Sequence, residues 1–132
     1  MAATILDGLA LAKQIRAELA EKTARLKQDR GITPRLSVIL VGEDPASVTY
    51  TRMKKKACEA AGMLSDLIEL PADSTQEQVK AVIADLNADQ TVHGILVQHP
   101  VPKHLDELDI LSTVAVEKDV DGISAQSLGR LV

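Results

Sequence analysis

The feature that most constrains the fold of this chain is the near-continuous apolar run RLSVILV, bounded by Pro34 and Gly42. A short apolar run without alternation is typical of a strand covered on both faces, as in a parallel sheet. Two more strand patterns, at residues 63–70 and 92–98, are separated by longer stretches with helical spacing. This alternation predicts right-handed crossovers and a three-layer α/β sandwich, in which a mostly parallel sheet is flanked by helices.

The first two expected helices have recognisable ends. Apolar residues recur at helical intervals from Ile5 onward, and Gly31 is the expected stop. A second helix is expected to begin with Asp44 as its N-cap and Pro45 at its first position, where the missing N–H of proline costs nothing. This helix is expected to end near Ala61.

The remaining chain is expected to hold a third helix, a short fourth helix and an irregular tail. The third helix spans residues 73–87, with Ser74 and Glu77 as a capping box. Its expected buried stripe consists of Val79, Val82, Ile83 and Leu86. A short helix is expected within residues 103–114, and residues 117–132 are expected to be irregular up to a terminal apolar turn.

Composition limits the class of protein and its partners. Of the 132 residues, 45% are hydrophobic and only 1% are aromatic, so a single aliphatic core is expected. The formal net charge is −4, and no basic stripe with interleaved aromatic residues is present, which argues against nucleic acid as a partner. No apolar run approaches the roughly 20 residues of a membrane span, and no signal peptide is recognisable. A cytoplasmic protein without a membrane partner is expected.

The cysteine and histidine content argues against structural metal or disulfide chemistry. Cys58 is the only cysteine, which fits a reducing compartment, and its side chain is expected to be buried or half-buried. The three histidines do not have the spacing of a zinc site with other ligands. No metal site is expected.

Three side chains of the second expected helix share one face. Ser47, Tyr50 and Lys54 are spaced by three and four residues, which stacks them over successive turns. Lys55 and Lys56 point in other directions and are expected to be solvated. Of the three consecutive lysines, only Lys54 is therefore a candidate for chemistry.

Gln98 ends the third expected strand, and ligands of open parallel sheets bind beyond the carboxyl ends of the strands. A lysine acts as a general acid or base near neutral pH when partial burial favours the neutral amine. An amide such as Gln98 can orient the Lys54 amine without the charge of a carboxylate. Tyr50, the chain's only Phe, Trp or Tyr residue, offers a flat face to a planar ligand. The alternative is an ordinary solvated Tyr–Lys pair.

Two other polar segments allow more than one interpretation. Asp119 and Asp121 in KDVDG either contact a ligand or serve the turn itself, because Asp and Gly favour turns on their own. The segment GEDPAS precedes a helix but lacks the glycine-rich loop and lysine of a phosphate-binding loop. Because Glu43 and Asp44 would repel an anion, no phosphate site is expected there.

The motifs VGEDPASVTYTRMKKKACEAAGM, GILVQHPVP and EKDVDGISAQSLGRL occur together in this order. As a set they closely resemble the N-terminal catalytic domain of the bifunctional methylenetetrahydrofolate dehydrogenase/methenyltetrahydrofolate cyclohydrolase family, the FolD family. The stretch LDGLALAKQIRAEL is similar to the first helix of that family. The resemblance covers essentially the whole chain.

The resemblance implies a folate enzyme. Such enzymes oxidise 5,10-methylenetetrahydrofolate to 5,10-methenyltetrahydrofolate with NADP, or with NAD in some members, and hydrolyse the product to 10-formyltetrahydrofolate. It also implies a role in one-carbon metabolism and purine biosynthesis, a cytoplasmic location and a homodimeric parent protein.

The resemblance implies catalytic roles for Lys54, Gln98 and Tyr50, and substrate-binding roles for Tyr50, Asp121, Ser47 and Gln98. Lys54 matches the catalytic lysine, Gln98 matches the glutamine that hydrogen-bonds to it, and Tyr50 matches the tyrosine that packs along the folate. Asp121 matches the aspartate that holds the pterin edge, and Ser47 matches a serine near the lysine.

Two residues depart from the family pattern. The family often has Leu at the position of His99, so a more polar site mouth is expected here. Ser127 stands where the family usually has Asn, which puts the local contacts of that segment in question.

The family's second domain, a Rossmann-like module with a glycine-rich NADP loop, is absent from this chain, so no NADP-binding residue is assigned. Residues 1–122 are expected to form the tetrahydrofolate-binding catalytic domain, and residues 123–132 to start a linker toward the NADP-binding domain. Alone, the chain is expected to lack dehydrogenase activity and to expose an apolar patch. The alternative function is a non-catalytic folate-binding module that keeps Tyr50 and Asp121.

Overall fold

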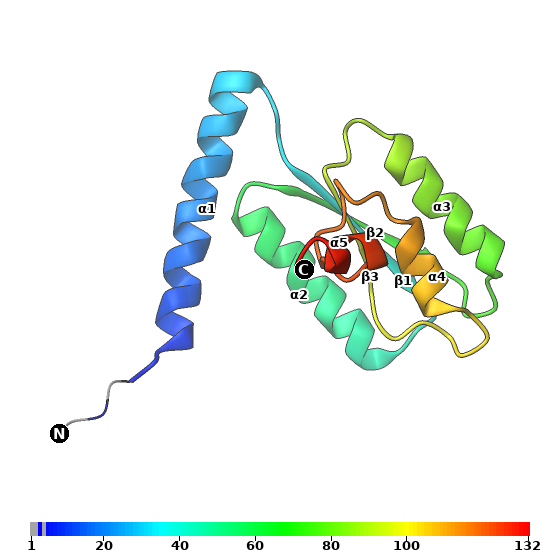
Figure 1. Ribbon diagram of the computed structural model, residues 1–132. Coiled ribbons are helices and arrows are strands. Elements are labelled where there is room, and N and C mark those ends of the chain that lie inside the picture. Colours follow the sequence, from blue (N-terminus) through cyan, green and yellow to red (C-terminus); the bar gives the residue numbers. More distant parts are fainter. Residues whose placement is uncertain (1–2, 4) are drawn as a thin grey trace.

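Three parallel strands form the centre of the described chain (Figure 1). They are β1 Arg35–Val41, β2 Leu64–Leu70 and β3 Gly94–Val97, arranged in the order β2-β1-β3. The central strand β1 pairs with both neighbours, so that Ile39 lies opposite Ile68 in β2 and opposite Val97 in β3. This computed structural model describes residue 3 and residues 5–132. The expected parallel sheet is confirmed.

The helices of residues 5–132 are α1 Gly8–Arg30, α2 Pro45–Ala60, α3 Gln76–Ala88, α4 Glu107–Thr113 and α5 Ala125–Gly129. Two of them, α2 and α3, pack against the sheet. α2 connects β1 to β2, whereas α3 connects β2 to β3 on the other side of β1. Because both crossovers are right-handed, α2 and α3 lie on opposite faces, and α4 packs beside α3 (Figure 1). The three-layer α/β sandwich is confirmed.

The main core lies between the sheet and the layer of α3 and α4. Val79 and Ile83 of the predicted α3 stripe are fully buried, and Val82 and Leu86 pack partly buried against the same cluster. The other face of the sheet meets α2 through short side chains, since Ser47 and Thr51 are the buried residues of that helix. Short side chains let α2 lie close to the strands.

Helix α1 stands apart from the sheet (Figure 1). Thr23 is its one buried residue. Its contact with the rest of the fold lies beside the end of α2, where Gly62 adopts a positive φ of 74° and a Cβ there would lie 3.5 Å from Thr23. Large apolar side chains near and along α1 are exposed: Ile5, Leu6, Leu9, Leu11, Ile15 and Leu19. None of the described helices has the length and apolarity that a membrane span needs.

The capping box predicted for α3 is wrong by one residue. The N-cap is Thr75, which exchanges hydrogen bonds with Gln78, at 3.2 Å from the Gln78 N–H to Thr75 Oγ1 and at 2.9 Å from the Thr75 N–H to Gln78 Oε1. Ser74 instead donates its hydroxyl to the Pro71 carbonyl at 2.7 Å, which closes the preceding turn. The pair Ser74 and Glu77 and the pair Thr75 and Gln78 both fit the capping-box pattern. The Ser74 hydroxyl is bound to the Pro71 carbonyl, so Thr75 is the residue that caps the helix.

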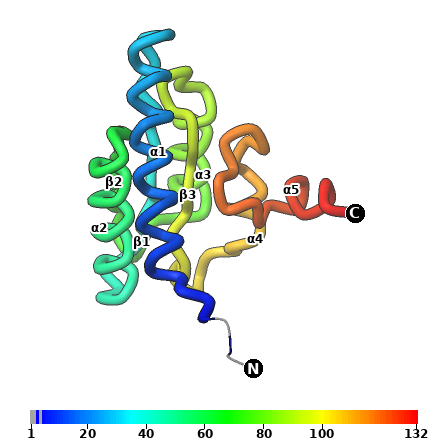
Figure 2. The backbone as a smooth tube through the Cα atoms, turned by 90° about the vertical axis from the view of Figure 1, so that its left-hand side faces the viewer, coloured from blue at the N-terminus to red at the C-terminus, as the bar shows by residue number. Residues whose placement is uncertain are grey.

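The tail that was expected to be irregular is partly ordered. Lys118 and Asp119 run alongside β3, with an Ile95 N–H bond to the Lys118 carbonyl at 2.8 Å and a parallel bridge between Ile95 and Asp119. α5 then begins after the N-cap Ser124. Figure 2 shows α5 extending away from the sheet, beyond α4. The local sequence gave no strand pattern here because the pairing depends on a distant edge.

Two charged side chains hold the tail in place. Lys118 Nζ donates to the carbonyls of Leu86, Asn87 and Asp89 at 2.9, 2.9 and 2.7 Å, so it caps the end of α3. These are carbonyls that the helix itself leaves without a donor.

Asp119 is the carboxylate that organises the turn. Its oxygens accept from the Gly122 and Ser124 N–H groups at 3.0 and 3.1 Å, and from the Ser127 hydroxyl at 2.6 Å. Burial opposes ionisation of Asp119, but the hydrogen bonds from Ser127, Ser124 and Gly122 outweigh it and hold the pKa of this carboxyl below its ordinary value. The turn interpretation is therefore confirmed for Asp119, and Ser127 makes a defined contact.

Replacing Lys118 with Met should lower the free energy of unfolding by about 2 kcal/mol, because three carbonyls at the end of α3 lose a charged donor. Urea denaturation measures this loss. Lys103→Met, at an exposed position, is the control and should change stability by less than about 0.5 kcal/mol. Equal effects of the two substitutions would contradict the capping role.

The stability contributed by Asp119 should depend on pH. Since its pKa is lower in the folded chain than in the unfolded chain, the contribution is present above about pH 4 and is lost as the pH falls through the folded pKa. Urea denaturation at several pH values should show Asp119→Asn less stable than the parent at pH 7, with the difference shrinking in acid. A constant difference from pH 7 to pH 3 would rule this out.

Candidate active site

Gln98 lies at the centre of a hydrogen-bonded chain of groups at the carboxyl edge of the sheet. Its N–H donates to the Ile39 carbonyl at 2.9 Å, which extends the pairing of β3 with β1 by one residue and fixes the Gln98 backbone. Its side-chain Nε2 donates to the His99 carbonyl at 2.9 Å, and its Oε1 accepts from Lys54 Nζ at 3.0 Å. Because a carbonyl only accepts, Nε2 must face His99, and Oε1 is thereby turned toward Lys54.

Ser47 joins α2 to the same carbonyl. This residue is only 2% exposed, and its hydroxyl donates to the His99 carbonyl at 3.0 Å. Its backbone N–H donates to the carboxylate of the N-cap Asp44 at 2.8 Å, as predicted for this helix start. The hydrogen bonds from Ser47 lower the pKa of the Asp44 carboxyl. The first turn of α2 is therefore attached to the segment that follows β3.

Lys54 lies two helical turns after Ser47, and its half-buried amine faces a neutral partner. Among the ion pairs of residues 5–132, none involves Lys54. Lys55 and Lys56 are exposed, as the helical spacing predicts. The amide oxygen of Gln98 orients the Lys54 amine without placing a second charge beside it.

Tyr50 precedes Lys54 by one helical turn, and its side chain is 58% exposed. The ring is therefore not part of the core. Met53 on the same helix is also exposed, at 60%. An exposed ring next to a polar hydrogen-bonded group can stack on a planar molecule.

Asp121 is the one predicted site residue that the structure does not join to the others. It is exposed and lies in the turn after Val120, and within the described chain no hydrogen bond connects it to Lys54, Gln98 or Ser47. The structure thus brings Ser47, Lys54 and Gln98 into one network, with Tyr50 on the adjoining turn of α2.

Sequence analysis missed two parts of this network. The first is the main-chain carbonyl of His99, which carries no signal in the residue type. The second is Glu107 of α4, whose Oε1 lies 2.9 Å from His99 Nδ1. His99 is expected to make the site mouth more polar, and its imidazole pairs with this carboxylate.

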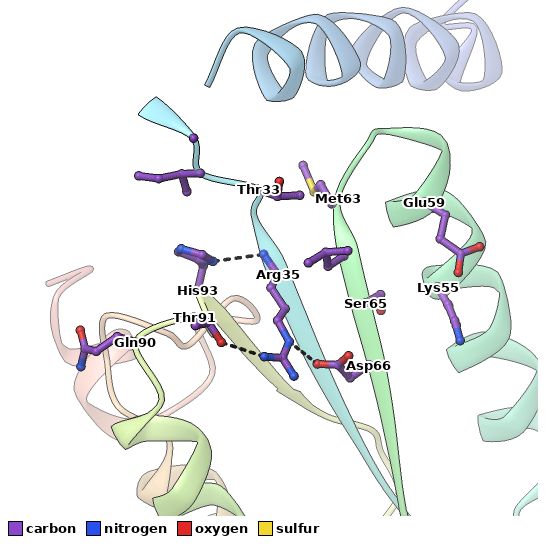
Figure 3. A pocket seen from close by; sticks show the side chains of 13 residues that line it. Thr33, Arg35, Lys55, Glu59, Met63, Ser65, Asp66, Gln90, Thr91 and His93 are labelled. Carbon is purple, nitrogen blue, oxygen red and sulfur yellow. Dashed lines mark hydrogen bonds and ion pairs between the residues drawn. The ribbon is translucent and has the colours of Figure 1, made fainter. Parts of the chain in front are cut away.

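A cavity of about 660 Å³ opens at the opposite, amino edge of the sheet (Figure 3). Some of its polar groups bind one another: Arg35 pairs with Asp66 and donates to Thr91 Oγ1 at 2.7 Å, while the Arg35 N–H donates to His93 Nδ1 at 3.1 Å. Because a parallel sheet binds ligands at its carboxyl edge, the candidate site is the one around Lys54.

Comparison with known proteins supports a family assignment. A sequence model of the tetrahydrofolate dehydrogenase/cyclohydrolase catalytic domain matches residues 6–121. The chain is 48% identical over 132 residues to the bifunctional protein FolD of Lysinibacillus sphaericus, covering 100% of this chain and 46% of that protein. It is 52% identical over 128 residues to FolD of Chloroherpeton thalassium, covering 97% and 44%.

Solved structures agree. The FolD methylenetetrahydrofolate dehydrogenase/cyclohydrolase of Campylobacter jejuni superposes with a TM-score of 0.96 at 47% identity, covering 98% of this chain and 46% of that one. The Trypanosoma brucei enzyme, complexed with NADP cofactor and inhibitor, gives a TM-score of 0.92 at 40% identity, covering 98% and 44%. This chain spans about half the length of the curated relatives it matches. The chain therefore belongs to the tetrahydrofolate dehydrogenase/cyclohydrolase family, whose catalytic domain its residues 6–121 match.

Proposed function

We propose that this chain supplies the folate-binding and acid–base residues of a methylenetetrahydrofolate dehydrogenase/methenyltetrahydrofolate cyclohydrolase. The observation that carries the proposal is the 3.0 Å hydrogen bond from Lys54 Nζ to Gln98 Oε1 at the carboxyl edge of the sheet. It couples a half-buried amine to a neutral amide in a chain that belongs to this family. In this proposal residues 1–122 form the tetrahydrofolate-binding unit.

The hydrolytic step uses Lys54 as a proton relay. The neutral amine accepts a proton as water adds to the methenyl carbon, and it returns a proton to N5 of the folate as the bond between that carbon and N5 breaks. The proton of the remaining hydroxyl goes to solvent as the formyl group forms. The step thus consumes one water and releases one proton, and the amine ends as it began.

A neutral lysine suits the charge of this substrate. The methenyl group is cationic, so an ammonium ion beside it would be repelled, whereas a neutral amine is not. Gln98 orients the amine without placing a negative charge beside it. The absence of a carboxylate partner for Lys54 within residues 5–132 is thus a requirement of the proposed step.

Three further residues complete the proposed folate site. Tyr50 packs its exposed ring along the folate, and Asp121 holds the edge of the pterin. Ser47 contributes indirectly, because its hydroxyl fixes the carbonyl that orients Gln98. The exposure of Tyr50 and Asp121 leaves both side chains accessible to a ligand.

The proposed dehydrogenase step uses NADP, held mainly by residues outside this chain. The start of α2 does not fit a nucleotide phosphate, because its N-cap is Asp44, directly after Glu43. Their carboxylates oppose a pyrophosphate at that helix end. We also infer a cytoplasmic location, a role in one-carbon metabolism that supports purine biosynthesis, and a homodimeric complete enzyme.

Replacing Lys54 with Met should abolish hydrolysis and leave folate binding in place. Methionine keeps the length of the side chain but cannot relay protons, and positioned acid–base groups contribute about 10²- to 10⁴-fold. The measurement is the decay of methenyltetrahydrofolate absorbance above the buffer rate for this chain and its variant, with a parallel binding titration. The expected loss is at least about a hundredfold.

Tyr50→Ala is the matched variant for this experiment, since it removes the exposed ring one turn away and should weaken binding instead. Hydrolysis at the parent rate by Lys54→Met would exclude the acid–base role. Folate binding without any hydrolysis by the parent chain would favour the non-catalytic binding module.

A further inference from the structure

The segment from Gln98 to Val101 is held by a single carboxylate of α4. Glu107 Oε1 lies 2.9 Å from His99 Nδ1, and Glu107 Oε2 accepts from the Val101 N–H at 3.2 Å. The Glu107 side chain therefore binds this segment on both sides of Pro100. Two contacts from the two oxygens of one planar group restrict rotation as well as distance.

The segment from Gln98 to Val101 carries the hydrogen-bond partner of Lys54, the Gln98 side chain, and the carbonyl that orients it. The His99 carbonyl accepts from both Gln98 Nε2 and Ser47 Oγ, at 2.9 and 3.0 Å. Any rotation of the His99 peptide would move this acceptor, and the Gln98 amide would lose the contact that turns its oxygen toward Lys54. The orientation of the His99 carbonyl is thus the link between Glu107 and the amine.

Helix α4 is a rigid support for this contact. Ile110 is fully buried and Leu111 is 7% exposed, both within the main hydrophobic cluster. On the other end of the segment, Val101 packs partly buried against the same cluster. Glu107 therefore connects a loop of the candidate site to an element anchored in the core, which is how a precise constellation is held.

We propose that Glu107 is a positioning residue for the candidate site: its carboxylate fixes the His99–Val101 segment and thereby the Gln98 amide that orients Lys54. The geometric part of the proposal concerns only this chain, whereas its catalytic consequence rests on the proposed function. Glu107 touches neither Gln98 nor Lys54 directly, so its effect reaches the amine through the His99 peptide.

The geometric part is tested by NMR of the ¹⁵N-labelled chain and its Glu107→Ala variant. The Gln98 side-chain amide signals should shift, and the Val101 amide proton should exchange at least about tenfold faster, because both lose their restraint. Asp109→Ala is the matched control on the same helix. The Asp109 carboxylate accepts from Lys80 and Gln76 of α3 and makes no hydrogen bond to residues 98–101.

Glu107→Gln separates positioning from general damage to α4. Its amide oxygen can still accept from the Val101 N–H, and its NH₂ can donate to a neutral His99 ring, so most of the Gln98 shift should be reversed. Unchanged Gln98 and Val101 signals in Glu107→Ala would overturn the proposal. So would an equal disturbance in Asp109→Ala, because Glu107 would then only stabilise the helix.

The catalytic consequence is measured separately as methenyltetrahydrofolate hydrolysis. Glu107→Ala should lower kcat about tenfold with little change in KM, because the amine is misplaced and the folate contacts remain. If the parent chain does not hydrolyse the substrate, the proposed function fails for this chain, while the NMR comparison still decides the positioning role.

Discussion

The candidate site depends on one acceptor, the main-chain carbonyl of His99. It receives hydrogen bonds from the Gln98 amide and the Ser47 hydroxyl, which come from the end of β3 and from the first turn of α2. Without it, Gln98 could present either its nitrogen or its oxygen to Lys54, and the amine would have no defined partner. With it, the side-chain amide has one orientation, and α2 is docked at the position where Lys54 can reach it.

The sheet order makes this acceptor available. Because β1 is central and α2 crosses one face while α3 crosses the other, the end of β3 lies beside the start of α2. Ser47 and Thr51 are the buried residues of α2, and their small size allows the helix to approach the sheet closely enough for the Ser47 hydroxyl to reach a backbone carbonyl. Ser47 therefore serves both the packing of α2 against the sheet and the hydrogen bonding of the site.

The sequence predicts the elements well because their signals are local. The apolar run of β1, the Asp44–Pro45 start of α2 and the stop at Gly31 each depend on a few neighbouring residues, and all three are confirmed. The α3 cap is displaced by one residue because two overlapping pairs satisfy the same local pattern. The order of the tail was missed because it depends on contacts of Lys118 and Asp119 with residues that local pattern does not relate to them.

The residues of the candidate site also fall into those that sequence patterns predict and those that they do not. Helical spacing places Ser47, Tyr50 and Lys54 on one face, and the carboxyl-edge rule brings Gln98, 44 residues from Lys54, to the same place. The His99 carbonyl and the contacts of Glu107 could not be predicted, since a backbone oxygen has no residue-type signature and Glu107 is an ordinary acidic residue in the first turn of a helix. Their importance follows only from the distances.

The most direct measurement of the central claim is methenyltetrahydrofolate hydrolysis by Gln98→Glu. This substitution keeps the size of the side chain but replaces the donor that faces the His99 carbonyl and places a negative charge beside Lys54. The account predicts a folded protein whose hydrolysis rate at neutral pH falls by about a hundredfold, because the new carboxylate pairs with the amine that must relay the proton. Hydrolysis at the parent rate would contradict the claim that a neutral, carbonyl-oriented amide is the partner that Lys54 needs.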